Sequence, residues 1–198
     1  MVVIDATMLL PLLRPGVLNP AGPGGVPIDR PKERIDFLVK ELEAAGIKII
    51  IPAPALSEVL VRAGSVASQE ITERLGKLAV FRIEPFDTRA AVEVAAMTRN
   101  AISAGNKKGS SDATWAKLKF DRQIVAIARV CGATTIYSDD RHLRSMAIRA
   151  KIKVIGLADL PLPAESAQLD MHLSGSASGS ATVTGEVLAK EEPTKAPP

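Results

Sequence analysis

Carboxylate side chains stand at the ends of the chain's predicted structural elements, and together they suggest one chemistry. Asp5 closes a short apolar run, Glu58 lies inside an apolar segment, Asp121 begins an apolar stripe at helical spacing, and Asp139 and Asp140 follow a second run. Several carboxylates cannot stay ionised together without a counter-charge. Oxygen ligands without histidine or cysteine select Mg²⁺ or Mn²⁺ over zinc. These acids are therefore predicted to hold one or two such ions, which commonly activate water for phosphodiester cleavage.

Each acid also has a purely structural interpretation. Asp5, and one of Asp139 and Asp140, stand where they would cap a following helix. Glu58 fits a lone polar position on a partly exposed helix, and Asp121 fits a solvated first helical turn. The structural interpretation requires that every one of these acids has a separate structural role. A metal site requires only that the acids lie close together.

Alternating strand and helix patterns would position the acids. Apolar, mostly β-branched runs predict strands at 2–4, 47–51, 80–84, 133–137 and 152–155. Helical spacing predicts helices at 31–45, 55–63, 67–77, 88–104, 120–131 and 141–150, and 8–13 suggests either a helix start or an apolar turn. This alternation predicts a three-layer α/β/α fold with a central, mostly parallel sheet of four to five strands. The ends of the first and fourth strands then meet at one edge of the sheet.

Two segments lack such patterns. Residues 14–31 are rich in proline and glycine and predict a long loop. Residues 164–198 are rich first in Ser, Gly and Ala and then in Pro and Glu, which predicts a disordered low-complexity tail. The expected folded domain is therefore 1–163.

Composition sets broader limits. Apolar residues make up 46% and aromatic residues 3%, so the core must be aliphatic, and a single cysteine fits a reducing compartment. No signal-peptide pattern and no membrane-length apolar run is visible, so a cytoplasmic location without membrane association is expected. The net charge is +3, and because 164–198 carry −3, the predicted domain carries +6. That excess is compatible with a polyanionic partner without demanding one.

The order of four short motifs resembles the PIN domain, an α/β/α nuclease-like fold that includes the VapC-type ribonuclease toxins. The motifs are VVIDAT, PALSEVL, FDRQIVAIARVCGA and TIYSDD followed by RHL, and the resemblance covers essentially 1–155. It implies a metal-dependent ribonuclease with Asp5, Glu58 and Asp121 as three of the family's acids. Thr7 matches the small hydroxyl residue that often follows the first acid.

The fourth acid has two candidates. The family's Thr-x-Asp can be placed on 138–140, which makes Asp140 the ligand and lets Ser138 supply the hydroxyl. It can also be placed, less well, on 137–139, which makes Asp139 the ligand. Asp140 is preferred for the hydroxyl that precedes it, and Asp139 stays beside it as the alternative.

Basic residues suggest where RNA would bind. The candidates for holding phosphates near the metal are Lys107, Lys108, Lys117, Lys119 and Arg122, and the alternative is an ordinary solvated basic face. No aromatic platform for stacking bases is visible in the sequence, so no RNA preference can be assigned. His142, the one histidine of the predicted domain, is expected at the surface.

The primary prediction is a metal-dependent endoribonuclease acting on RNA, and the resemblance favours a homodimer. A toxin is a narrower prediction, because the insertion at 14–29 and the tail differ from compact toxins. For a toxin, an antitoxin should cover the acidic edge over 8–13 and 14–31. The alternatives are a PIN-like module that binds RNA or protein without cutting, and a haloacid-dehalogenase-like phosphatase. The phosphatase needs Asp-x-Asp at the first strand, where this chain has Asp5 and Thr7.

Overall fold

Five short strands form the centre of the structure, a computed structural model that describes residues 1–14, 20–105 and 113–164. The strands are β1 (Val2–Ile4), β2 (Ile49–Pro52), β3 (Phe81–Glu84), β4 (Thr135–Tyr137) and β5 (Lys153–Ile155). They form one sheet in the order β3-β2-β1-β4-β5, and every neighbouring pair is parallel. The predicted α/β fold with a parallel sheet is therefore confirmed, and the sheet is entirely parallel.

The central strands are buried on both faces, which explains their uninterrupted apolar sequences. All residues of β1 and β2 are buried, and Ile50 in β2 and Ile136 in β4 are fully inaccessible to solvent. A strand covered on both faces by helices has no polar side and so shows no alternation. β3 at one edge is more exposed and carries charged residues.

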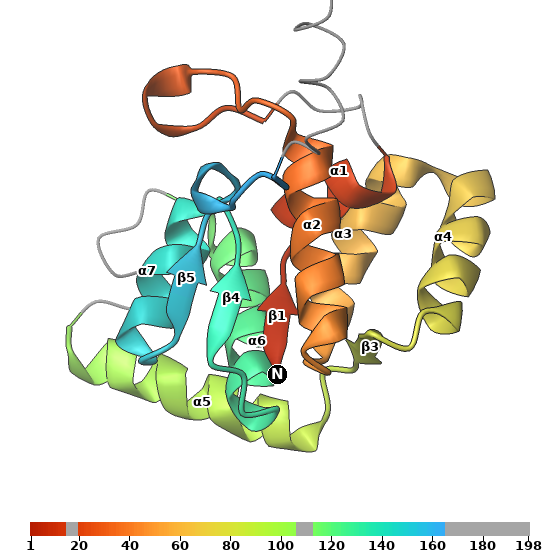
Figure 1. Ribbon diagram of the computed structural model, residues 1–198. Coiled ribbons are helices and arrows are strands. Elements are labelled where there is room, and N and C mark those ends of the chain that lie inside the picture. The colour runs from red at the N-terminus through yellow and green to blue at the C-terminus, as the bar shows by residue number, and fades with distance from the viewer. Residues whose placement is uncertain (15–19, 106–112, 165–198) are drawn as a thin grey trace, which may run out of the picture. The chain divides into compact units, whose positions relative to one another are not determined.

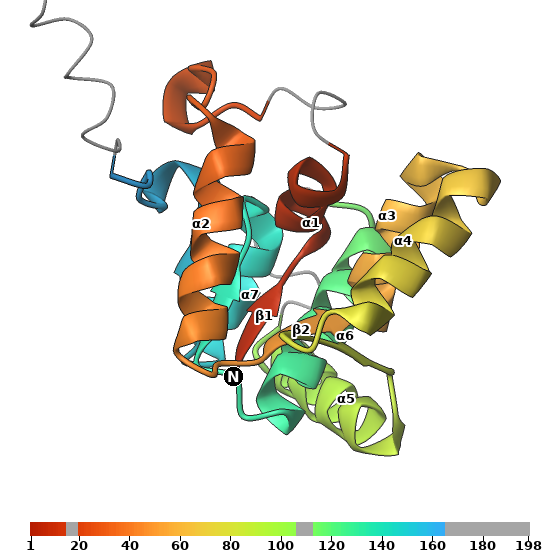
Figure 2. The same ribbon diagram turned by 45° about the vertical axis from the view of Figure 1, so that its right-hand side comes forward.

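Seven helices surround this sheet among the described residues. They are α1 (Ala6–Leu13), α2 (Pro31–Ala44), α3 (Ala53–Ala63), α4 (Ser65–Lys77), α5 (Thr88–Ser103), α6 (Trp115–Val130) and α7 (Arg141–Arg149). Figures 1 and 2 show α2 and α6 on opposite faces of the sheet, with β1 between them. The predicted three-layer arrangement follows from this placement.

The order of the strands creates a special position between β1 and β4. From β1 the chain proceeds outward through β2 to β3, and it then returns to the other side of β1 to form β4 and β5. The carboxyl ends of two adjacent strands thus lead into connections that diverge in opposite directions. In open α/β sheets, such a switch point is where ligands bind. Asp5 directly follows β1, and Ser138 directly follows β4.

Some elements differ from the sequence prediction. Helix α6 begins at Trp115 rather than Phe120, because Thr114 Oγ1 accepts a hydrogen bond from the Lys117 backbone N–H at 3.3 Å and caps the helix. Residues 6–13 form a helix. Within the predicted 14–31 loop, residues 20–30 contain one 3₁₀ turn, Pro23–Gly25. Residues 15–19 and 165–198 lie outside the described residues, so the tail and the domain boundary remain predictions.

None of the helices in the described ranges has the length and apolar character needed to span a membrane.

Two isoleucines with different burial should contribute very different amounts to the free energy of unfolding. Ile50→Ala should lower the free energy of unfolding by about 2–5 kcal/mol, because Ile50 is fully buried in β2 and truncation leaves a cavity. Ile148→Ala on α7 is the matched control, because Ile148 is 60% exposed and its change should stay within about 0.5 kcal/mol. Urea denaturation followed by circular dichroism measures both, and equal losses would contradict the assigned core.

Candidate metal centre

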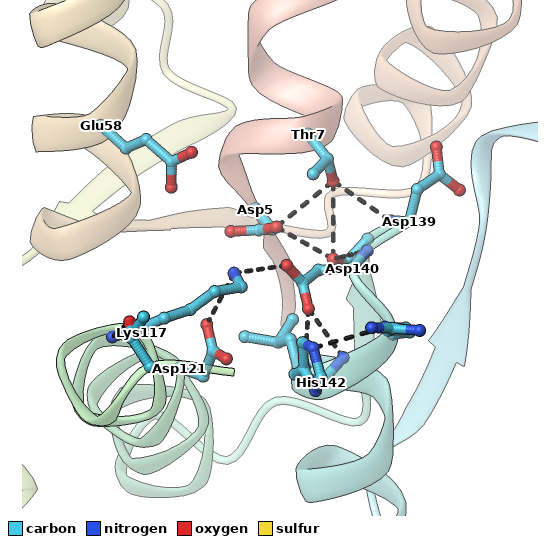
Figure 3. A network of polar contacts seen from close by, with 12 residues as sticks. Asp5, Thr7, Glu58, Lys117, Asp121, Asp139, Asp140 and His142 are labelled. Atoms are coloured by element: carbon cyan, nitrogen blue, oxygen red, sulfur yellow. Dashed lines mark hydrogen bonds and ion pairs between the residues drawn. The ribbon is translucent and has the colours of Figure 1, made fainter. Parts of the chain in front are cut away.

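Asp5 is held at the end of β1 by two hydroxyl groups. Its side chain is buried, and Oδ2 accepts hydrogen bonds from Ser138 Oγ at 2.9 Å and from Thr7 Oγ1 at 3.3 Å. Thr7 Oγ1 also accepts the backbone N–H of Asp139 at 3.1 Å, and Ser138 Oγ accepts that of Asp140 at 3.0 Å. These bonds join the loop after β1 to the loop after β4 (Figure 3). Thr7 and Ser138 therefore fix the orientation of the Asp5 carboxylate.

Asp140 combines a structural role with a place in the site. Its Oδ1 accepts the backbone N–H groups of His142 at 2.8 Å and Leu143 at 3.0 Å, which caps α7. Its Oδ2 lies 2.6 Å from Lys117 Nζ. The capping interpretation is therefore correct for this acid, and capping leaves the second oxygen directed at the site.

Asp121 lies on α6, and its carboxylate is incompletely hydrogen-bonded. Its side chain is buried, and Oδ1 lies 3.5 Å from Lys117 Nζ, one helical turn earlier. Its Oδ2 is buried and has no hydrogen-bond partner among the described residues. The Lys117 ammonium thus lies between Asp121 and Asp140 (Figure 3).

Burial and mutual repulsion raise the pKa values of two of these carboxylates, Asp5 and Asp121. Burial raises the pKa of Asp121 to about 7; the nearby Lys117 opposes this rise, and the charges of Asp140 and Asp5 add to it. Burial also raises the pKa of Asp5, against hydrogen bonds from Ala6 and Ser138. For Asp140, burial acts upward, but the Lys117 hydrogen bond and the capping N–H groups leave its pKa lowered. The positive charge of Lys117 therefore compensates the cluster only in part, which is the situation expected of acids that bind a cation.

Asp139 lies outside this set. Its Oδ1 accepts the backbone N–H of Leu157 at 2.9 Å, and Figure 3 shows its side chain directed away from Lys117 and Asp121. A Cβ at Gly156 would come within 2.8 Å of the same oxygen, so a side chain there would displace the Asp139 carboxylate. The structure thus gives Asp139 a bracing role between two loops and favours Asp140 as the fourth acid.

Glu58 and the acids line one cleft between α3 and α6, at the carboxyl ends of β1 and β4. Glu58 on α3 is half-exposed and pairs with Arg62, at 2.7 Å from Arg62 Nη2 to Glu58 Oε1. The cleft has a volume of about 400 Å³. It is lined by Asp5, Thr7, Pro54, Ser57, Glu58, Val61, Arg62, Lys117, Phe120, Asp121, Ile124 and Asp140.

Six lining residues escaped the sequence analysis, although a signal for them existed. Pro54, Ser57, Val61 and Arg62 recur with Glu58 at helical spacing on α3. Phe120 shares a face of α6 with Lys117, Asp121 and Ile124 by the same spacing. Helical spacing from Glu58 on α3 and from Asp121 on α6 identifies the lining residues of each helix in the sequence. It does not show that the two helices face each other.

The predicted phosphate-holding residues divide into three groups. Lys117 lines the cleft. Arg122 is buried and donates to Thr98 Oγ1 at 3.2 Å, and both Arg122 and Lys119 lie over the Trp115 ring, so neither lines the cleft. Lys107 and Lys108 lie outside the described residues.

The fit of a metal ion can be judged from the donor atoms. Over residues 1–14, 20–105 and 113–164, no group of three or more His, Cys, Asp or Glu side chains is placed so that it could hold a metal ion. The oxygens of Asp5, Asp121 and Asp140 nevertheless share one cleft, and the unpartnered Asp121 Oδ2 needs a positive ligand. These residues suit a hard divalent cation, with Lys117 as the group that such an ion would displace.

Comparison with solved structures shows a VapC-like fold, the fold expected of a PIN domain. VapBC from Salmonella typhimurium, solved bound to DNA, has a TM-score of 0.51 and 13% identity, covering 79% of this chain and 97% of that one. VapBC2 from Rickettsia felis, bound to a DNA fragment from its promoter, has a TM-score of 0.51 and 12% identity, covering 79% and 98%. VapC20 from Mycobacterium tuberculosis, a toxin that cleaves the sarcin–ricin loop, has a TM-score of 0.46 and 15% identity, covering 73% and 94%.

No protein-family model matches the chain, and no relative is found among curated proteins. At these identities the likeness shows the shared fold alone.

The raised pKa of Asp121 predicts an unusual dependence of stability on pH. Between pH 4 and pH 7 the folded protein keeps a proton on Asp121 that the unfolded chain, with the ordinary aspartate pKa of 3.8, has released. Raising the pH through this window should therefore lower the free energy of unfolding of the metal-free protein, by up to about 1 kcal/mol per pH unit. The lowered pKa of Asp140 and the raised pKa of Lys117 act outside this window.

Chemical denaturation in EDTA from pH 5 to pH 8 measures this slope, and Asp121→Asn should reduce it. The raised pKa values of Asp5 and Asp139 act in the same direction and account for what remains. Asp87→Asn is the control, because Asp87 caps α5 far along the chain from the site and its pKa is lowered. A slope that is the same in Asp121→Asn as in the wild type would show that Asp121 is not the group responsible.

Proposed function

We propose that this protein is a metal-dependent endoribonuclease whose active site is the cleft between α3 and α6. The observation that carries the proposal is the meeting of three carboxylates from separate parts of the chain at the switch point of the sheet. Asp5, Asp121 and Asp140 share this cleft, and Asp121 keeps a buried oxygen without a partner. The VapC-like fold supports the same assignment.

Different residues of the cleft would have different roles in the reaction. Asp5, Asp121 and Asp140 would hold Mg²⁺ or Mn²⁺, with Asp5 oriented by Ser138 and Thr7. Glu58, half-exposed on the facing wall, would lie near the metal-bound RNA. When bound, a divalent ion lowers the pKa of a coordinated water and offsets negative charge on the scissile phosphate. The buried position of Asp5 and Asp121 keeps water from weakening these interactions.

The fold neighbours also support a protein partner. Both structures with a TM-score of 0.51 are VapBC assemblies bound to DNA. We therefore propose that the protein acts as the toxin of a toxin–antitoxin pair, with an antitoxin that covers the cleft. A homodimer remains a prediction of the family resemblance.

The test is cleavage of a mixed RNA pool by the purified protein in Mg²⁺, Mn²⁺ or EDTA. Cleavage should need the metal, and Asp5→Asn, Asp121→Asn and Asp140→Asn should each lower kcat/KM at least about 100-fold. Even residues that only orient a metal ligand typically cost 10- to 100-fold. Asn at 140 retains an oxygen for the helix cap, so its loss of activity would report the lost charge.

Asp139→Asn is the matched control for these variants, because its carboxylate bonds to Leu157 outside the cleft and an amide oxygen can accept the same bond. It should keep near wild-type activity. Cleavage that survives Asp5→Asn and Asp121→Asn would contradict the proposed site. RNA binding without cleavage in any metal would instead support the non-catalytic module.

Lys117 should compete with the metal ion. Lys117→Met removes the ammonium between Asp121 and Asp140 and should raise the affinity for Mn²⁺ about tenfold, a moderate effect because the Lys117 side chain is 42% exposed. Lys119→Met on the same helix is the control, because Lys119 faces Trp115 instead. Isothermal titration calorimetry measures both, and unchanged or weaker binding in Lys117→Met would refute the competition.

A further inference from the structure

A half-exposed phenylalanine lies in the wall of the acid cleft. Phe120 is 51% exposed and lines the same cavity as Asp5, Asp121 and Asp140. It is the most exposed of the four phenylalanines; Phe86 follows at 38%, and Phe37 and Phe81 are less exposed. Leaving a large aromatic side chain in water forfeits the free energy that its burial would contribute. A single exposed apolar residue is common, but this one stands beside the proposed reaction centre.

Helix geometry fixes Phe120 in that place. It precedes Asp121 and lies three residues after Lys117, so these side chains project from one face of α6. Val61 on the facing helix α3 is 83% exposed and lines the same cleft, as does Pro54. The cleft therefore has an apolar part, formed by Pro54, Val61 and Phe120, beside its carboxylates.

We propose that Phe120 stacks on a nucleobase of a single-stranded RNA substrate, next to the phosphate that is cut. This inference deepens the proposed function and rests on it. Single-stranded RNA can splay out a base, and stacking on an aromatic ring is the general way in which proteins hold such bases. A base paired within a duplex cannot present its face to Phe120, so the subsite selects unpaired RNA.

The charges around the cleft suit a nucleotide better than an apolar peptide. The Lys117 and Arg62 side chains line the cleft with Phe120. Lys117 pairs with Asp140 and Arg62 with Glu58, so these cations would reach the phosphates beside a stacked base by exchanging those partners. An apolar peptide would leave these charged groups desolvated and unpaired, which opposes its binding.

The experiment compares two ligands that carry the same phosphates. A labelled oligouridylate and an abasic chain of the same length are titrated with wild-type protein in EDTA, where a metal-dependent nuclease does not cut, and binding is followed by fluorescence anisotropy. The wild type should bind oligouridylate about 5- to 150-fold more tightly than the abasic chain, the usual contribution of one stacked base. Phe120→Ala should lose this preference and leave affinity for the abasic chain unchanged. Phe120→Trp should retain the preference.

Phe86→Ala is the matched control, because Phe86 is exposed but does not line the cleft, and it should behave as the wild type. A Phe120→Ala protein that still prefers the base-containing chain overturns the subsite, as does equal loss in Phe86→Ala. Circular dichroism confirms that each variant is folded. If the wild type cleaves RNA but Phe120 makes no difference, the subsite fails and the nuclease stands. If the preference depends on Phe120 but no metal supports cleavage, the nuclease fails and the base-binding site stands.

Discussion

Negative charge buried at the carboxyl ends of β1 and β4 is the constraint on which the rest of the site depends. Asp5 and Asp121 are both almost inaccessible to solvent, and Asp140 lies close enough to raise their pKa values. Such a cluster is costly unless hydrogen bonds and positive charge compensate it. Ser138 and Thr7 supply hydrogen bonds, and Lys117 supplies one charge. That compensation is incomplete, because Asp121 Oδ2 is buried without a hydrogen-bond partner among the described residues.

Helix α6 serves the site and the core with different faces. Lys117, Phe120 and Asp121 face the cleft, while Arg122 is buried and bonds to Thr98 of α5. Basic residues that are close in sequence are thereby separated: one sits among the acids and the others pack around Trp115. The local density of positive charge in the sequence is therefore a poor guide to where a phosphate would bind. What matters is which side of the helix each side chain occupies.

The shared fold and the particular chemistry of this chain are separate matters. A VapC-like arrangement of sheet and helices is reached here with sequence identities of 12–13% to the solved neighbours. A fold positions a switch point but does not determine what happens there. The function has to be argued from the side chains at that point, of which Asp5, Asp121 and Asp140 share one cleft. The apolar wall with Phe120 and Val61 would then decide which nucleic acid the cleft accepts.

The sequence by itself determined the strands, the parallel sheet and the acids that lie at its edge. Uninterrupted apolar runs mark strands buried on both faces, and parallel strands necessarily bring their carboxyl ends together, so Asp5 and the pair Asp139/Asp140 could be placed without coordinates. Sequence patterns left the choice between those two acids open, because both follow β4 and either could cap α7. Only the tertiary structure distinguishes their surroundings: Asp139 bonds to Leu157, and Asp140 turns one oxygen to Lys117. Likewise, the cleft wall of Val61, Arg62 and Phe120 arises where α3 meets α6, a contact between distant segments that no local pattern encodes.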